Sequence, residues 1–179
     1  MNNRTLQQKT DKQLLNRHVA GDKEAFGVLF KRHHRHMHAV ATRIVGQDAE
    51  DAVQDGMVSA YRKADQFHGD SAVKTWLHRI VVNSCLDIAR RRPLVAQGGD
   101  EPPTPTSRIT QARQRLDIGQ HWHVLSPEQK ACLVLVHMMG YSFHEAARIL
   151  CVSEGTLKSR CARGRARLAC RLQGYGKAS

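Results

Sequence analysis

The sequence lacks a long apolar run, a secretory signal and any cysteine pair of the form CxxC. No segment of its 179 residues comes near the roughly 20 consecutive apolar residues that a membrane-spanning helix needs. The first residues, MNNRTLQQKTDKQ, lack the apolar core of a secretory signal. We therefore expect a soluble, cytoplasmic protein.

Cysteine is present in an odd number and without paired spacing, which implies neither a disulfide framework nor a zinc knuckle. The five cysteines are Cys85, Cys132, Cys151, Cys161 and Cys170. We expect most of them to be reduced and to act as small, partly buried apolar residues. A redox switch stays the alternative, because thiol reactivity depends on surroundings that a sequence does not reveal.

Negative charge is in short supply. The chain holds 28 Lys and Arg against 16 Asp and Glu, which gives a formal net charge of +12. This excess favours a polyanionic partner, above all a nucleic acid. An anionic membrane surface is the rival interpretation of the same charge.

The alternation of apolar and polar residues that indicates a β-strand is also missing, whereas helical periodicity runs through most of the chain. Between residues 22 and 46, Asp22 is a candidate N-cap and Gly46 a candidate helix end. Apolar residues recur there at intervals of three and four: Phe26, Leu29, Phe30, Met37, Val40, Ala41 and Ile44. This spacing predicts a long helix with one face in a core.

Two further helices are predicted over residues 48–67 and 74–92. The first combines an apolar face with acids in its first two turns: Asp48, Glu50, Asp51 and Asp55. Compensation of the helix dipole is one explanation of these acids, and it needs no partner. In the second helix one side gathers Leu77, Ile80, Val81, Ser84, Cys85 and Ile88 and is expected in the core; the opposite side, expected to be exposed, carries Trp76, Arg79, Asn83 and Arg90.

The composition changes sharply at RRPLVAQGGDEPPTPTSR, which contains four of the five prolines of the chain. Such a segment buries too little apolar surface to fold alone and is typical of an extended, flexible linker. The sequence therefore predicts an all-α protein with two small helical domains, one on each side of this linker.

The second domain is marked by clear helix boundaries. Ser126 and Gln129 form a capping box around Pro127, and Gly140 fits the end of that helix. Ser142 and Glu145 repeat the box for a short helix through Leu150, and Ser153 caps a long basic helix. A short helix, a tight turn and a second helix are typical of a helix-turn-helix, whose second helix enters the DNA major groove.

The basic helix divides into faces that suit this role. Leu157, Cys161, Gly164, Leu168 and Leu172 share one side and are expected to pack on the domain, while small residues opposite allow a close approach to DNA. We expect Lys158 and Arg163 at base edges, and Arg160, Arg165, Arg167 and Arg171 at phosphates. A helix that is basic only for solubility is the alternative.

The run HHRHMH, residues 33–38, is the remaining conspicuous feature. His34 and His38 lie four residues apart on one helical face, a spacing that can bind a transition metal. No carboxylate or cysteine at ligand spacing completes a set, so we favour a solvated, basic helix face over a metal site.

The order of these motifs resembles the extracytoplasmic-function sigma factors of bacterial RNA polymerase, and most of all the actinobacterial sigma-M group. The resemblance rests on AEDAVQD, WLHRIVVNSCLDIARRR, the proline-rich linker and LSPEQKACLVLVHMMGYSFHEAARILCVSEGTLKSRCARGRARL, and it covers roughly Asp11 to Leu172. It implies sigma region 2 at residues 11–92, a flexible linker at 93–108 and sigma region 4 at 109–174.

The resemblance also implies a role for each surface. The polymerase-binding residues would be Glu50, Asp51, Gln54 and Asp55. Recognition and melting of the −10 promoter element would fall to Phe67, His68, Lys74, Trp76, Arg79, Asn83, Arg90, Arg91 and Arg92, although packing stays the alternative for Trp76. The −35 element would be read by Thr156, Lys158, Ser159, Arg160, Ala162, Arg163 and Arg167.

The partners implied are core RNA polymerase, through its clamp helices and flap, and promoter DNA as −35 duplex and single-stranded −10 element. An anti-sigma factor, often membrane-bound, would cover both domains, and the linker would run toward the RNA exit channel. The resemblance implies a stress response and no catalysis, cofactor, metal or small-molecule substrate. Two other hypotheses are a stand-alone helix-turn-helix regulator and a metal-dependent nucleic-acid enzyme built on the histidines.

Two positions depart from the pattern of the family. Gly56 stands where a bulkier apolar residue is usual, and glycine inside a helix costs about 1 kcal/mol relative to alanine. Cys151 stands in the helix-turn-helix turn where glycine is usual. The backbone there is expected to adopt a conformation that cysteine tolerates poorly, which would change the turn slightly.

Overall fold

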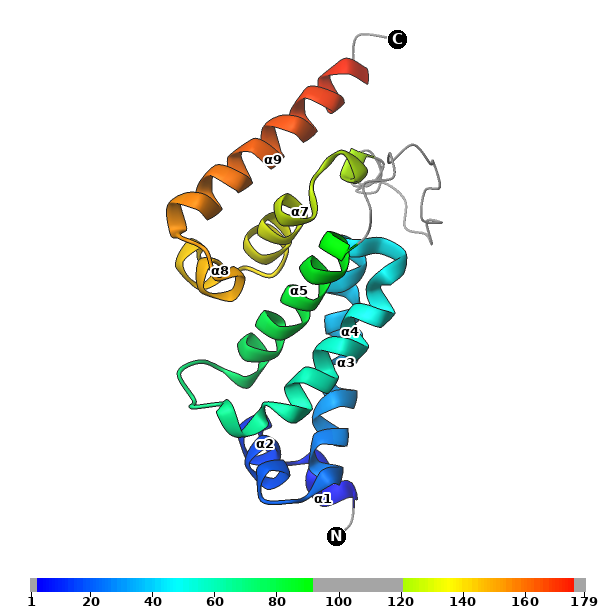
Figure 1. Ribbon diagram of the computed structural model, residues 1–179, viewed down its shortest axis with the longest axis vertical. Helices are drawn as coiled ribbons and strands as arrows, with labels where there is room; N and C mark the ends of the chain where they lie inside the picture. Colours follow the sequence, from blue (N-terminus) through cyan, green and yellow to red (C-terminus); the bar gives the residue numbers. More distant parts are fainter. Residues whose placement is uncertain (1–2, 92–120, 176–179) are drawn as a thin grey trace. The chain divides into compact units, whose positions relative to one another are not determined.

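The computed structural model describes residues 3–91 and 121–175, and within these ranges it contains helices and no strand (Figure 1). The all-α class expected from the sequence is confirmed. The chain divides into two compact units. The predicted linker at 93–108, Arg92 and the start of the second predicted domain lie outside the described residues.

Within residues 3–91, the first domain contains five α-helices, which Figure 1 shows in blue to green. They are α1 (Asn3–Gln7), α2 (Asp11–Val19), α3 (Lys23–Val45), α4 (Ala49–Arg62) and α5 (Val73–Arg91), with short 3-10 turns at Gly46–Asp48 and Ala64–Gln66. The long α3 packs against both α2 and α4. The domain is thus a helical bundle arranged around α3.

The boundaries of α3 follow the local chemistry of its ends. Asp22 is the N-cap, and its carboxylate accepts the backbone N–H of Ala25 at 3.3 Å. The Arg17 guanidinium lies 2.8 Å from Asp22 and lowers the pKa of that carboxyl. Gly46 ends the helix with a φ of 65°, which glycine adopts readily. Both predicted boundaries are confirmed.

The predicted core face of α3 is also largely confirmed. The residues of this face that are buried are Phe26, Leu29, Met37, Val40, Ala41 and Ile44, whereas Phe30 is half-buried. In α4 the buried positions are Ala49, Ala52, Val53, Gly56, Met57 and Ala60. These two faces supply much of the core of the first domain.

Gly56 permits a close crossing between α4 and α5. A Cβ atom built on Gly56 would lie 2.9 Å from Val81 Cγ2 and 3.0 Å from Val81 Cα. Because the second contact is with backbone, a side chain here would push the two helices apart. The departure from the family pattern at Gly56 therefore has a structural reason in Val81, which leaves no space for a bulkier residue.

The buried face of α5 differs in part from the sequence prediction. Leu77, Val81 and Cys85 are buried as expected, but so are Val73, His78, Val82 and Leu86, whereas Ile80, Ser84 and Ile88 are half-buried. Trp76 and Asn83, expected to be exposed, are half-buried. Trp76 packs on the Phe67 ring, with centroids 5.5 Å apart, and Asn83 borders the buried face one turn before Leu86.

The second domain contains α7 (Pro127–Leu133), α8 (Phe143–Leu150) and α9 (Glu154–Tyr175), preceded by a 3-10 turn at Trp122–Val124 (Figure 1). The predicted capping box is present: Ser126 Oγ accepts the N–H of Gln129 at 3.3 Å, and Gln129 Oε1 accepts the N–H of Ser126 at 3.1 Å. The helix continues beyond α7 as a π-helical segment, Val134–Met138, and Gly140 follows with a φ of 74°.

The remaining boundaries of this domain also agree with the sequence. Ser142 and Glu145 form the second capping box, with Glu145 accepting the backbone N–H of Ser142 at 2.9 Å. Ser153 caps α9 by accepting the N–H of Thr156 at 3.1 Å. Cys151, in the turn between α8 and α9, has a φ of 53°. It therefore adopts the left-handed conformation expected at this position, which favours glycine.

The cysteines mostly serve as small core residues. Cys85, Cys132 and Cys161 are buried, Cys151 and Cys170 are exposed, and all five are free thiols. Burial raises the pKa of Cys85 and of Cys132 to about 12, so both stay protonated at neutral pH.

Among the described residues, no helix is long and apolar enough to cross a membrane.

Candidate polymerase and nucleic-acid interfaces

The exposed side of α4 carries an acidic face that consists of Glu50, Asp51, Gln54 and Asp55. All four side chains are exposed, while the residues between and after them, Ala52, Val53, Gly56 and Met57, are buried. The helical repeat thus separates a packing face from an acidic face on one short helix. Asp48, just before the helix, makes no N-cap hydrogen bond with its side chain.

Glu50 differs from the other acids because it lies against α3. Its two carboxylate oxygens lie 3.5 Å from His34 Nε2 and 3.5 Å from His38 Nε2. The rings of His34 and His38 are stacked, with centroids 6.1 Å apart. Glu50 therefore faces two histidines of α3, whereas no ion pair is found for Asp51 and Asp55 within the described residues.

The histidine run is not the uniformly solvated face that we expected. His33 is buried and lies 2.7 Å from Asp11, and His36 packs on His78 with ring centroids 5.1 Å apart. The partners of this run come from α2, α4 and α5, which sequence spacing does not reveal. No group of three or more His, Cys, Asp or Glu suited to a metal ion is found in residues 3–91 or 121–175.

His78 is the most strongly perturbed base of the first domain. Its side chain is fully buried, and burial together with the nearby His36, Lys74 and His33 lowers its pKa to about 3. Burial also lowers the pKa of His36, and Lys74 and His33 add to that shift. Both histidines are thus held neutral at physiological pH.

The residues assigned to the −10 element gather around the loop between α4 and α5. Phe67 and Trp76 pack on each other, His68 and Lys74 are exposed, and a hollow of about 280 Å³ opens beside them. The hollow is lined by Phe67, Gly69, Ser71, Ala72, Val73 and Lys74, together with Thr10, Asp11 and Lys12 at the start of α2. The contribution of α2 was missed by sequence reasoning, since nothing in the spacing brings residue 12 to residue 69.

The arginines assigned to −10 phosphates lie along the exposed side of α5. Arg79, Arg90 and Arg91 are all exposed, and Arg90 forms an ion pair with Asp87 at 3.3 Å. Asn83 lies on the same helix but is half-buried. At the start of α5 the structure thus brings together the Phe67–Trp76 ring pair, the hollow, and the cations Lys74 and Arg79. Arg90 and Arg91 lie at the other end of the helix.

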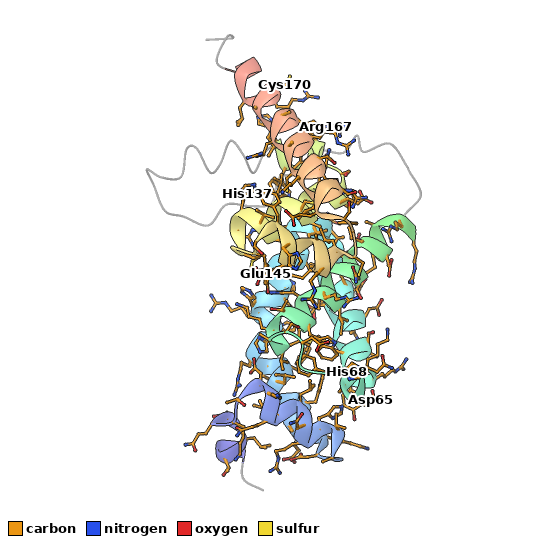
Figure 2. All side chains as sticks on the ribbon, turned by 90° about the vertical axis from the view of Figure 1, so that its left-hand side faces the viewer. Asp65, His68, His137, Glu145, Arg167 and Cys170 are labelled. Atoms are coloured by element: carbon orange, nitrogen blue, oxygen red, sulfur yellow. The ribbon has the colours of Figure 1, made fainter. Side chains whose placement is uncertain are left out.

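The residues assigned to the −35 element lie on α9. Leu157, Cys161 and Gly164 are buried as predicted, whereas Leu168 and Leu172 are only half-buried. Lys158, Ser159, Ala162, Arg163 and Arg167 are exposed, and Thr156 and Arg160 are half-buried. Arg167 and Cys170 both project from the C-terminal part of the helix (Figure 2). The predicted division of this helix into a packing face and a basic face is therefore present.

Several of these side chains have partners inside the domain. Arg163 Nε donates to the Ser159 carbonyl at 3.4 Å, and Arg167 donates to the Val124 carbonyl at 3.4 Å. Lys158 Nζ lies 2.6 Å from Glu154 and 5.8 Å from the centroid of the Phe143 ring. Hydrogen bonding to Lys158 lowers the pKa of the Glu154 carboxyl. Glu154 was missed in the sequence, although its spacing of four residues before Lys158 is the usual signal for a helical ion pair.

Comparison with known protein families supports a sigma factor in both domains. Residues 29–93 match the model for sigma-70 region 2, and residues 123–168 match the model for sigma-70 region 4. The two matches fall on the bundle around α3 and on the helix-turn-helix. Together they define a sigma-70 type of promoter-recognition protein.

The similarity to individual relatives extends along the chain. The chain is 48% identical over 171 residues to the ECF RNA polymerase sigma factor SigM of Mycobacterium tuberculosis, and the match covers 94% of this chain and 87% of the relative. It is 30% identical to the ECF RNA polymerase sigma-E factor of Haemophilus influenzae, covering 93% of this chain and 97% of that protein. The chain belongs to the extracytoplasmic-function (ECF) sigma factors, which direct RNA polymerase to promoters and are not enzymes.

Solved structures give the same assignment. CnrH in complex with the cytosolic domain of CnrY matches with a TM-score of 0.63 and 28% identity over 93% of this chain and 99% of that chain. The sigma factor RpoE in complex with the anti-sigma factor NepR from Bartonella quintana matches with a TM-score of 0.64 and 28% identity over 83% of this chain and 96% of that chain. The alternative of a stand-alone regulator requires a receiver domain of alternating strands and helices. Residues 3–91 contain helices and no strand, which argues against it.

Proposed function

We propose that this sigma factor divides its partners between three surfaces. The acidic face of α4 binds the clamp helices of core RNA polymerase, the start of α5 with its loop binds single-stranded −10 DNA, and α9 reads the −35 duplex. The observation that carries the proposal is the opposite charge of the two exposed helix faces: α4 presents acids and α9 presents arginines.

The acidic face suits a protein partner rather than DNA. Asp51 and Asp55 are exposed and carry negative charge, which repels phosphates. A basic protein surface complements this charge and gains speed of association from it. Dipole compensation accounts for acids in the first turn, but Asp55 lies beyond that turn, where the dipole effect has fallen off.

The loop before α5 suits an unpaired base. Phe67 and Trp76 offer aromatic rings for stacking, and base stacking on aromatics is worth roughly 1–3 kcal/mol per base. The neighbouring hollow has room for a planar group, and Lys12 and Lys74 border it with positive charge. Arg79, Arg90 and Arg91 then follow the sugar-phosphate backbone along α5.

The basic helix suits duplex DNA. The N-terminal residues of a recognition helix contact base edges in the major groove, and Lys158, Ser159 and Arg163 are exposed in the first half of α9. Ala162 is small and exposed, which allows a close approach to the bases. Arg160 and Arg167 hold phosphates, while Thr156 contacts the helix end through Ser153, at 2.8 Å between the two hydroxyl oxygens.

Two further parts of the proposal concern regulation and setting. RpoE, a solved neighbour, is found with an anti-sigma factor, and we assign an inhibitor of that kind to this chain as well, in a form anchored to the membrane. The second domain would also contact the polymerase flap. The protein would act in the cytoplasm during a stress response, because bacterial polymerase and promoters are there.

Charge reversal on α4 tests the division between the surfaces. The double change Asp51→Lys with Asp55→Lys should abolish capture of the full chain by immobilised core polymerase and leave the helical circular dichroism unchanged. The matched control is Asp65→Lys, which changes an exposed acid outside the acidic face. Undiminished capture of the α4 variant would rule out this face as the polymerase site.

A further inference from the structure

The first turn of α9 holds an ion pair between Glu154 and Lys158. A surface that binds only phosphates does not need the acid of this pair. Between Glu154 and Tyr175 the sequence contains six basic residues and one acid, Glu154. The side chain of Glu154 is 42% exposed, and its carboxylate lies 2.6 Å from Lys158 Nζ. An exposed carboxylate repels the DNA backbone, so its presence on this helix lowers non-specific affinity.

Two side chains of α8, Phe143 and His144, lie beside this pair. The Lys158 ammonium lies 5.8 Å from the centroid of the Phe143 ring, so the cation has Glu154 on one side and an aromatic ring on another. His144 Nδ1 approaches Glu154 at 3.9 Å. Contacts from α8 and α9 thus place one acceptor and one donor side by side near the N-terminus of the recognition helix.

The chemistry of such a pair matches one base pair of the major groove. Cytosine presents its N4 amine as a donor there, and guanine presents O6 and N7 as acceptors. In a C·G pair these groups lie next to each other on one edge. We infer that Glu154 and Lys158 together read a single C·G pair, Glu154 accepting from cytosine N4 and Lys158 donating to guanine O6. This inference rests on the proposed −35 reading by α9, and it adds Glu154 as a specificity-determining residue.

A purely structural role makes a different prediction. A Glu four residues before a Lys slightly stabilises a helix, and an acid in the first turn interacts favourably with the helix dipole. Either effect alters the stability of α9 without changing which base is preferred. Base preference therefore separates a reading role from a structural one.

The test uses the full chain assembled with bacterial core RNA polymerase and a promoter library randomised through the −35 element, with sequencing of the transcripts. Glu154→Gln should reduce the preference for C·G at one position roughly tenfold and shift it toward A·T, because a Gln amide pairs well with adenine. Lys158→Met should relax the same position, and the double variant should relax it no further. The matched control, Glu145→Gln, removes an acid from the capping box of α8 and should leave every base preference intact.

The outcomes separate this inference from the proposed function. An unchanged base profile in Glu154→Gln, or relaxation of two different positions by the two single variants, overturns the inference even if Arg163→Ala still alters −35 preference. A wild-type protein without any −35 preference overturns the proposed reading by α9 and the inference with it.

Discussion

Helices α4 and α9 are built alike on their buried side and oppositely on their exposed side. Each has a buried apolar stripe, and each has a buried glycine where another helix passes: Gly56 against Val81 in the first domain and Gly164 against Leu133 in the second. Outside, α4 presents Asp51 and Asp55, whereas α9 presents arginines. Burial of an apolar stripe stabilises both helices in the same way. The opposite sign of their exposed charge is the basis of the proposed division between polymerase and DNA.

The two domains differ again in the titratable groups that they bury. The first domain buries His78, a base whose charge changes near neutral pH when it is in water. Among its described residues the second domain buries no histidine. Its buried thiols, Cys132 and Cys161, stay protonated, as Cys85 of the first domain does, because burial raises the pKa of each. Acidification should therefore affect the first domain more than the second.

The largest expected effect is this difference in acid stability. The pKa of His78 is 6.5 when unfolded and about 3 when folded, so the unfolded state binds more protons between these values. The stability contributed by neutral His78 is complete above pH 6.5 and falls by up to about 1.4 kcal/mol per pH unit below it, or by about 3 kcal/mol at pH 4. The pKa of His36 is also lowered, so His36 adds to the loss of stability in acid.

The two tryptophans allow each domain to be followed separately in the full chain. Trp122→Phe leaves Trp76 as the reporter of the first domain, and Trp76→Phe leaves Trp122 as the reporter of the second. Urea unfolding by fluorescence at pH 7 and pH 4 should show a larger loss in the first domain, and His78→Leu should reduce that loss. Equal losses in both domains, or no influence of His78→Leu, would show that this histidine does not carry the difference.

Base reading by α9 is expected to be the next largest effect. Arg163→Ala should reduce −35 discrimination at one position by about 1–3 kcal/mol, because Arg binds guanine through two hydrogen bonds. The measurement is the transcript profile of the polymerase complex on a promoter library randomised in the −35 element. If the preference stayed intact, the exposed face of α9 would have been assigned wrongly.

The glycines give a smaller effect that again contrasts the domains. Gly56→Ala should destabilise the first domain by about 1–2 kcal/mol, since the added Cβ meets the backbone of Val81 at 3.0 Å. Gly164→Ala should be near neutral, because its closest neighbour is the tip of the Leu133 side chain at 3.1 Å, which can move.

Gly27→Ala, with nothing within 4 Å, is the control and should stabilise α3 by about 1 kcal/mol. Urea denaturation of the three variants tests this order. A Gly56→Ala protein as stable as Gly27→Ala would mean that α4 and α5 do not cross as closely as described.

The smallest expected effect concerns a phosphate contact. Arg167→Ala should weaken duplex binding about equally for all sequences and reduce the dependence of log K on log salt by about one unit. Binding titrations at several salt concentrations measure this slope for specific and random duplexes. A change confined to the specific duplex would assign Arg167 to base reading instead.

Local signals were predicted well from the sequence, and contacts between distant segments were not. The caps at Asp22, Ser126 and Ser153 and the left-handed turn at Cys151 each depend on a few neighbouring residues, and all four are present. The pairing of His33 with Asp11 depends on how α2 and α3 pack, which no spacing encodes.

The candidate sites show the same limit. The exposed acids of α4 and the basic face of α9 follow from helical periodicity, so they could be named in advance. The half-buried state of Trp76 depends on Phe67 from the preceding loop, and the hollow beside it depends on Lys12 of α2. Periodicity within one helix contains no information about either neighbour.

The most direct test of the central claim is in vitro transcription with purified bacterial core RNA polymerase, with and without this protein, on a pooled promoter library with sequenced transcript starts. The account predicts new starts that require the protein and lie downstream of one shared pair of −35 and −10 elements. Absence of new starts, together with tight binding of duplex DNA by the protein alone, would contradict it.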